Sequence, residues 1–509
     1  MKRLLAMLLC VITLAGCGSQ GGAYIPTGDG LHQDVTTVPT EPEAEKEQEL
    51  ILVYYPNKSL NPYLSTDFTN RALFPLVYQG LFSVDDQYNV VPILCKNYKI
   101  SKDMTVHTFY LENATFSDGE VITPEDVVAS LQMAKSNGAY TGRLTQIQSI
   151  RESDDGGVVI TTNTPYENLA ILLDIPIVKA EEVNAERPLG TGAYYYDDSI
   201  AGLRLCRRNN WWCYSNMSVT ASTIPLRQGT SPSQIRDSFQ FDNVSLVCAD
   251  PGSDTFADFR CDYELWDCEN GIFLYLACNM QSEVFSNTTI RSALTHAVDR
   301  DLLANSYYRG FARSATLPAS PQSPYYNTNL ARNYGYDAAA FAAAVEASGM
   351  DGREIVLLVN SDDTMRVRAA RAIANMLREG GLKVKLSELG GSSYRNALKK
   401  GNYDLHLGQT KLSPNMDLSA FFATKGALNY GGLGNASFLT ACWDALANSG
   451  NYYTLHKKVM EDGCLVPILF RSYAVYTERG TFASLDPARD NIFFYSIGKT
   501  MESIQVKAG

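Results

Sequence analysis

The most regular alternation of apolar and polar positions lies in the second half of the chain. Residues 354–360 form an apolar run and residues 382–386 alternate, as strands do, while 363–378 have the spacing of an amphipathic helix. The apolar face of that helix consists of Val367, Ala370, Ile373, Ala374 and Leu377. A second helix at 392–400 and a third strand at 403–408 follow. This order predicts an α/β fold with a parallel sheet covered by helices.

Such a sheet predicts where a ligand binds, because ligands of open α/β sheets lie beyond the carboxyl ends of the strands. The first strand ends at Asn360, and the third runs into Gln409 and Thr410. These three residues are therefore expected to line a cleft. The pattern is equally compatible with ordinary loop residues.

The first half of the chain has weaker periodicity. A short strand is expected at 51–55, a helix at 72–82 and sheet at 105–111. Thr123 and Pro124 open a further helix, because threonine is a favoured N-cap and proline is favoured at the first helical position.

Length and charge narrow the possible functions. The chain has 509 residues, enough for two or more domains, and a formal net charge of −12. That charge argues against nucleic acid as a partner and against electrostatic attraction to anionic lipid.

The sequence contains no recognisable catalytic or metal-binding motif. Neither a Gly-x-Ser-x-Gly elbow, a His-Glu-x-x-His helix nor a phosphate-binding loop is present, so no enzymatic activity and no cofactor are predicted. The five histidines are scattered and no Cys-x-x-Cys occurs, so no metal site is expected. Nine of the eleven cysteines follow Cys17, and pairs such as Cys206–Cys213 or Cys261–Cys268 are conceivable, but spacing does not determine connectivity.

The chain begins with a positively charged and then apolar leader. Residues 4–14 are too few to span a bilayer, which needs about 20 residues. Residues 14–17, Leu-Ala-Gly-Cys, resemble the lipobox of bacterial lipoproteins, which implies that Cys17 is lipidated and anchors an extracytoplasmic protein to the membrane. A short membrane anchor and a chance cysteine after an ordinary signal peptide are the alternatives.

The segment that follows the leader has the composition of a tether. Residues 18–49 are rich in Gly, Pro, Thr and Glu and carry few large apolar side chains, which predicts disorder. The acidic run at 41–49 is also compatible with the solvated face of a helix.

Several ordered motifs resemble one known family. They are YLENATFSDG at 110–119, ITPEDVV at 122–128, PLGTGAY at 188–194, IRSALTHAVDR at 290–300 and CLVPIL at 464–469. The series resembles the extracytoplasmic solute-binding proteins of family 5, the peptide- and nickel-type substrate-binding lipoproteins of ABC transporters. Ordered matches run from about residue 51 to 470.

The resemblance implies a two-lobed fold of the periplasmic-binding-protein type, with a cleft between the lobes and an extra inserted domain. The implied segments are a signal peptide and lipobox (1–17), a tether (18–49), lobe I (50–76, 190–279 and 485–509), an inserted domain (77–189) and lobe II (280–484). It also implies that the chain captures an oligopeptide-like or other small polar solute and delivers it to a membrane permease.

The chain departs from the family pattern at the expected ligand site. Peptide-binding members have Trp and then an Asp that holds the peptide amine; here Gln409 and Leu412 occupy these places, and Asp417 lies five residues further on. A surface sensor or adaptor that keeps the binding fold without transport is therefore the alternative function. The candidate cleft residues are Thr66, Asn360, Gln409, Thr410, Lys411 and Asp417.

Overall fold

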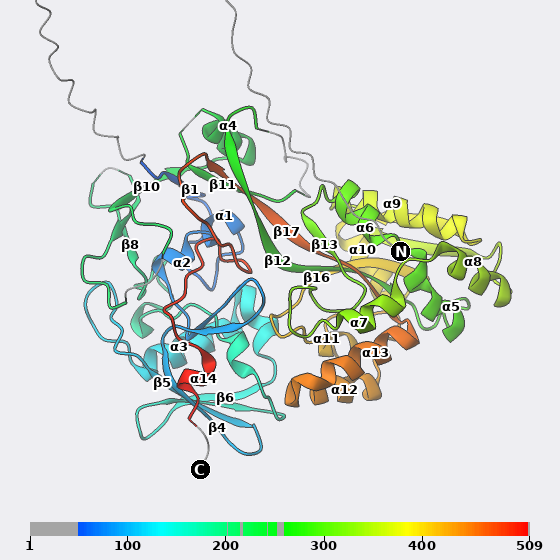
Figure 1. Cartoon of the computed structure of the whole chain (residues 1–509), viewed down its shortest axis with the longest axis horizontal. Coiled ribbons are helices and arrows are strands. Elements are labelled where there is room, and N and C mark those ends of the chain that lie inside the picture. The colour runs from blue at the N-terminus through cyan, green and yellow to red at the C-terminus, as the bar shows by residue number, and fades with distance from the viewer. Residues whose placement is uncertain (1–48, 201, 214–216, 242, 252–258, 507–509) are drawn as a thin grey trace, which may run out of the picture. The chain divides into compact units, whose positions relative to one another are not determined.

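The computed structural model describes residues 49–506, apart from 201, 214–216, 242 and 252–258 (Figure 1). The predicted signal peptide, Cys17 and nearly all of the predicted tether lie outside the described residues. Within the described ranges, no helix is both long and apolar enough to cross a membrane.

The largest sheet contains the predicted α/β region. Its strand order is β11-β17-β12-β16-β14-β15, and β13 also pairs with β17. The strands are β11 (Leu246–Ala249), β12 (Tyr263–Cys278), β13 (Ala312–Ser314), β14 (Glu354–Asn360), β15 (Lys383–Leu389), β16 (Leu405–Lys411) and β17 (Leu465–Glu478). Strand β14 runs parallel to both β15 and β16, so the predicted parallel unit is confirmed. Strands β12 and β17 pair antiparallel, which makes the complete sheet mixed.

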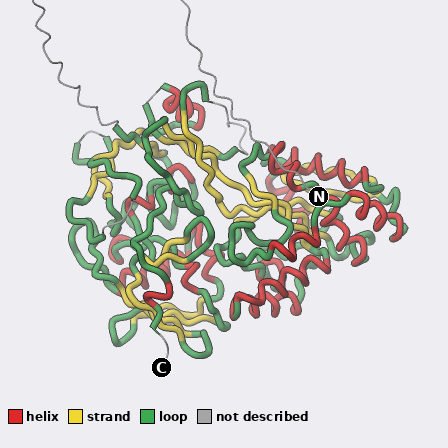
Figure 2. The backbone as a smooth tube through the Cα atoms, viewed as in Figure 1, coloured by secondary structure: helices red, strands yellow, loops and turns green. Residues whose placement is uncertain are grey.

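Successive side chains of a strand point to opposite faces of the sheet. In this parallel unit the side chains on both faces are apolar, and helices cover both faces. Ile355, Leu357 and Val359 share a core with α9 (Thr364–Glu379). Leu358 points to the other face, where it packs with Tyr394 and Leu398 of α10 (Gly391–Lys400). Figure 2 shows helices gathered around this end of the sheet.

The ends of these helices follow from local sequence. The Asp363 side chain accepts a hydrogen bond from the Arg366 amide at 2.9 Å and so caps α9. Helix α10 ends at Gly401, whose φ of 68° suits glycine. Helix α3 (Pro124–Ser136) begins where Thr123 and Pro124 predicted, with the Asp126 carboxylate accepting from the Thr123 amide at 2.8 Å.

The helix predicted at 72–82 is wrong over most of its length. Only α2 (Phe74–Val77) is helical, Tyr78 is extended, and Phe82 opens β2 (Phe82–Val84). Almost every side chain from 72 to 82 is buried, so apolarity here reflects burial on all sides rather than a helical face.

Two further four-stranded sheets are present among the described residues. One has the order β1-β10-β9-β8 and consists of β1 (Leu52–Tyr54), β10 (Thr223–Gln228), β9 (Arg204–Arg207) and β8 (Tyr194–Asp197). The other has the order β4-β5-β7-β6 and consists of β4 (Cys95–Ile100), β5 (Val106–Leu111), β7 (Val158–Thr162) and β6 (Ile147–Glu152). Strand β2 pairs with β3 (Val90–Pro92). The remaining helices are α1 (Phe68–Arg71), α4 (Pro232–Gln240), α5 (Thr288–Ala293), α6 (Arg300–Leu302), α7 (Thr328–Ala331), α8 (Ala338–Ala347), α11 (Ser419–Phe422), α12 (Ala436–Ala447), α13 (Tyr452–Asp462) and α14 (Met501–Ile504).

The long strands β12 and β17 connect separate parts of the chain. The first half of β12 pairs with the second half of β17, and the last residues of β12 pair with β16. Their register shifts between Glu269 and Phe273, where Gly271 has a φ of 69°. A Cβ at Gly271 would lie 2.6 Å from an Arg489 guanidinium nitrogen, so glycine allows that arginine to lie against the strand. The boundaries of the lobes and of the inserted domain stay a prediction.

Candidate functional site

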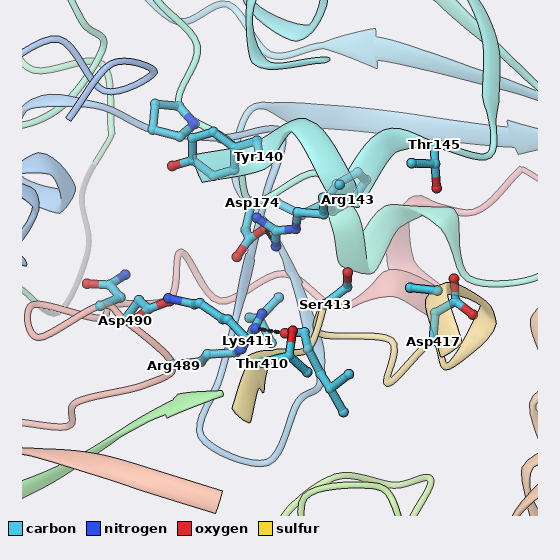
Figure 3. Close-up of a pocket in the computed structure, with 18 of the residues that line it drawn as sticks. Tyr140, Arg143, Thr145, Asp174, Thr410, Lys411, Ser413, Asp417, Arg489 and Asp490 are labelled. Atoms are coloured by element: carbon cyan, nitrogen blue, oxygen red, sulfur yellow. Dashed lines mark hydrogen bonds and ion pairs between the residues drawn. The ribbon is translucent and has the colours of Figure 1, made fainter. Parts of the chain in front are cut away.

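A cavity of about 890 Å³ lies beyond the end of β16 (Figure 3). Its lining combines segments that are far apart in the sequence, among them residues 66–84, 140–146, 410–428 and 489–495. Aromatic rings and aliphatic side chains share the wall with charged groups. This combination suits a site that holds a small solute, since apolar walls exclude water and a few polar groups orient the ligand.

Four of the six predicted cleft residues line this cavity, namely Thr66, Thr410, Lys411 and Asp417. The other two make contacts elsewhere. The Gln409 side chain accepts from Arg471 of β17 at 3.1 Å, and the Asn360 side chain accepts from the Asp362 amide at 3.1 Å in the turn before α9. The structure thus brings four candidates together, and their contact with a ligand stays a prediction.

Lys411 forms an ion pair with Asp490 at one side of the cavity. The side chain keeps 42 % of its surface accessible through the cavity, although protein surrounds it. Burial lowers the pKa of Lys411 to about 8, against the opposing effect of Asp490. Burial raises the pKa of Asp490, but Lys411, Arg489 and Arg71 outweigh it and hold that pKa below its ordinary value.

A second ion pair joins Arg143, from a short 3₁₀ helix at Gly138–Leu144, to Asp174. The Tyr140 ring lies close to two guanidinium groups: its centroid is 5.5 Å from Arg71 and 5.7 Å from Arg143. Both distances permit cation–π attraction. Burial lowers the pKa of Arg143, and the charge of Arg489 lowers it further.

Asp417 has a different environment from the other acids of the wall. Its carboxylate accepts hydrogen bonds from the Ser419 amide at 2.8 Å and the Ser419 hydroxyl at 2.6 Å. Within the described part of the chain it has no ion-pair partner, and Figure 3 shows it well away from Lys411 and Asp490. Burial raises its pKa. An ammonium group of a ligand would supply the missing positive charge.

The main charged residues of the wall escaped sequence reasoning. Arg71, Arg143, Asp174, Arg489 and Asp490 belong to four unrelated stretches, and none stands in a motif. Only the folded topology brings them together. The one available signal was their position near segments that resemble the family, which does not single out individual charges.

The side chains of the described residues bear on a metal centre and on the two disulfides considered above. Within the described ranges, no group of three or more His, Cys, Asp or Glu side chains gathers as metal ligands. The thiols of Cys206 and Cys268 donate to the Asp197 carboxylate and to the Ala488 carbonyl, so neither of the two disulfides considered above is present.

Comparison with known sequences identifies consistent relatives. The family model described as bacterial extracellular solute-binding proteins, family 5 Middle, matches residues 89–430. The nickel-binding protein NikA of Staphylococcus aureus is 24% identical over 332 residues, which is 64% of this chain and 61% of NikA. A putative ABC transporter peptide-binding protein of Brucella ovis is 22% identical over 337 residues, 60% of this chain and 62% of that protein. The match thus spans about three fifths of the length of these curated relatives.

Solved structures share the fold at low identity. NikA of Brucella suis in complex with Fe(III)-EDTA has a TM-score of 0.68 at 20% identity, over 87% of this chain and 98% of that one. The putative peptide-binding protein AppA of Clostridium difficile has a TM-score of 0.71 at 16% identity, over 87% of this chain and 98% of AppA. These neighbours are two-lobed binding proteins, so the predicted fold class is confirmed.

Proposed function

The chain belongs to the family 5 bacterial extracellular solute-binding proteins, and from this membership we propose that it captures a small polar or oligopeptide-like solute for a membrane ABC permease. The membership confirms the resemblance that the ordered motifs predicted. We further propose binding without turnover, in keeping with a family of substrate-binding proteins.

The cavity beyond β16 is the observation that carries this proposal. Its volume of about 890 Å³ lies within the usual range for small-molecule sites, roughly 300–1,000 Å³. Its walls come from segments predicted to belong to the inserted domain (77–189), to lobe II (280–484) and to lobe I (50–76 with 485–509). Closure of two lobes around a solute would bring such separate walls together, and we propose the predicted domain boundaries on this basis.

Asp417 is the proposed partner for an amine of the solute. The residue at the place of the family Asp is Leu412, which is 4% exposed and offers its carbonyl to Arg489 rather than a carboxylate to the cavity. Asp417 supplies a carboxylate that lines the cavity and lacks a cationic partner among the described residues. It can therefore take the role that Leu412 cannot fill.

The anchor and partner complete the proposal. Lipidation of Cys17 would hold the protein at the extracytoplasmic face of the cell membrane, and residues 18–49 would tether the binding lobes close to the permease. Among the relatives are proteins named for binding nickel and glutathione and others named as ABC transporter peptide-binding proteins. These names support a transport role and leave the solute of this chain to experiment.

Two measurements on purified protein test solute capture. Native mass spectrometry of freshly prepared protein should show a stoichiometric small molecule, and melting curves recorded against a peptide and metabolite library should rise for a narrow class of compounds, because a ligand that binds only the folded state stabilises it. Protein that carries nothing and never shifts with any compound would overturn the proposal.

The alternative, a surface sensor or adaptor, rests on the departures at Gln409 and Leu412. Gln409 makes its contact with Arg471 and does not line the cavity. Affinity capture from detergent-solubilised membranes separates the two functions. Recovery of a permease and its ATPase supports import, whereas recovery of a receptor without a permease supports sensing and contradicts the transport proposal.

A further inference from the structure

The cavity lining contains five cationic side chains and three carboxylates. We call the group formed by Arg71, Arg143, Lys411 and Arg489 with the acids Asp174 and Asp490 the cationic cluster. Each of its two acids pairs with one cation, Asp174 with Arg143 and Asp490 with Lys411. The cationic cluster itself therefore carries two more positive than negative charges, inside a protein whose formal net charge is −12. The buried Glu269 carboxylate, which does not line the cavity, also interacts with Arg489.

The members of the cationic cluster influence one another, so they form one site rather than isolated pairs. Arg489 lowers the pKa of both Arg143 and Lys411, while Arg71 adds to the effect on Lys411. Such repulsion between neighbouring cations works against folding. An excess of this kind is expected where recognition, rather than stability, determines the residues.

The guanidinium groups also keep unused donors. The Nε atoms of Arg143 and Arg489 are buried and have no hydrogen-bond partner among the described residues. Arg489 is 8% exposed, and its guanidinium donates to the Leu412 carbonyl. Arg71 donates to the Ser65 carbonyl at 3.4 Å and also interacts with Tyr140. Buried donors are normally satisfied, and a guanidinium matches the oxygen pair of a carboxylate or phosphate.

We propose that the cationic cluster binds the acidic portion of the solute, and that this portion carries two negative charges, as two carboxylates or one phosphate. The inference rests on the proposed function, because it assigns the solute of the same cavity to a chemical class. A solute with an amine at Asp417 and two acidic groups at the cationic cluster would satisfy both sides of the wall.

Calorimetric titration with three dipeptides tests the charge preference directly. Glu-Glu, Gln-Gln and Lys-Lys share a backbone and a free amine, while their side-chain charge differs. Glu-Glu should bind at least about tenfold more tightly than Gln-Gln, a factor that corresponds to about 1.4 kcal/mol. Glutarate and inorganic phosphate, which lack the amine, distinguish the two acidic chemistries.

Single substitutions locate the preference in the cationic cluster. Arg71→Gln and Arg143→Gln should each weaken Glu-Glu binding about tenfold or more and change Gln-Gln binding less than about threefold, because Gln-Gln lacks the two side-chain carboxylates that would lose a charged partner. Arg71 has no ion-pair partner among the described residues, unlike Arg143, so R71Q strands no carboxylate and should fold normally. Lys385→Gln, an exposed cation on the edge strand β15, removes the same charge outside the cavity and should leave binding unchanged.

The outcomes separate this inference from the proposed function. If Gln-Gln or Lys-Lys binds more tightly than Glu-Glu, or if R71Q and R143Q leave Glu-Glu binding intact, the charge assignment is overturned while solute capture stands. When no dipeptide binds, the solute retained by native protein decides: a molecule whose acidic groups carry two negative charges at neutral pH supports the inference, whether or not it also carries an amine, and a molecule with at most one such charge overturns it. Protein with neither a retained solute nor any binding overturns the proposed function, and the inference falls with it.

Discussion

The α/β region and the cavity wall differ in how well their buried side chains are packed and paired. In the α/β region, Leu357 of β14 and Ile373 of α9 are fully buried, and capped helices cover both faces of the strands. In the cavity wall, like charges face one another and buried guanidinium donors lack partners among the described residues. The packing of the α/β region favours the stability of the folded protein. The charges and unpaired donors of the cavity wall lower that stability, and a bound solute would restore it.

Strand β16 belongs to both regions. Its first four residues, Leu405–Gly408, are buried in the sheet, while Thr410 and Lys411 at its end line the cavity. The strand thereby places cavity-lining side chains on a rigid element. If the two regions differ in this way, substitutions in the α/β region should lower the stability of the protein, and substitutions in the cavity wall should lower its affinity for the solute.

The largest expected effect is a loss of stability caused by a substitution in the core of the α/β region. Ile373→Ala should lower the free energy of unfolding by about 2–5 kcal/mol, because it leaves a cavity in a fully buried core. Solute affinity of the folded fraction should not change. Urea titrations followed by circular dichroism measure the loss. Leu302→Ala, at a side chain that is 43% exposed, is the control and should cost less than half as much.

An equal loss of solute affinity in Ile373→Ala at temperatures where the protein is fully folded would contradict the separation. It would mean that core packing and the cavity wall are energetically coupled.

The next effect is a loss of affinity for the solute without a loss of stability. Asp417→Asn should weaken binding of amine-bearing solutes about tenfold to 100-fold, since a charge-assisted hydrogen bond contributes roughly 1.5–3 kcal/mol. Stability should stay the same or rise, because the substitution removes a buried carboxylate that has no cationic partner in the described part of the chain. Titrations of matched compounds with and without the amine check this. Equal weakening of both would assign Asp417 a structural role.

The family resemblance and the parallel α/β unit were predictable because local sequence determines them. Periodicity defined β14, α9 and β15, and the predicted helix at 363–378 agrees with α9 to within one residue at each end. The antiparallel partners β12 and β17 were not predictable, since the pairing joins segments about 200 residues apart. The end of β16 and the segment after it led to three of the cavity residues, Thr410, Lys411 and Asp417. Arg71, Arg143 and Arg489 reach the cavity only through tertiary structure.

A smaller effect tests how far burial of titratable groups extends outside the cavity. His456 on α13 is fully buried and both ring nitrogens lack hydrogen-bond partners among the described residues, and burial lowers its pKa from 6.5 to about 3. The unfolded chain takes up a proton at this histidine below pH 6.5 and the folded protein does not. Stability is therefore lost as the pH falls from 6.5 towards 3, by about 1.4 kcal/mol per pH unit.

His456→Leu should remove this dependence and reduce the difference in unfolding free energy between pH 7.5 and pH 5.5 by about 1.4 kcal/mol. Lys457→Gln, on the exposed side of the same helix, should keep the wild-type difference. Urea midpoints at the two pH values provide the measurement. An unchanged difference in His456→Leu would show that the neutral buried histidine does not contribute to acid sensitivity.

The most direct test of the central claim, that the cavity beyond β16 holds the solute, is a crystal structure of the protein with the molecule it retains or with its tightest library compound. We expect electron density in the cavity, with an acidic group in contact with Arg71 or Arg143 and a polar group at Asp417. Density for the solute elsewhere on the protein, with only water in this cavity, would contradict the account.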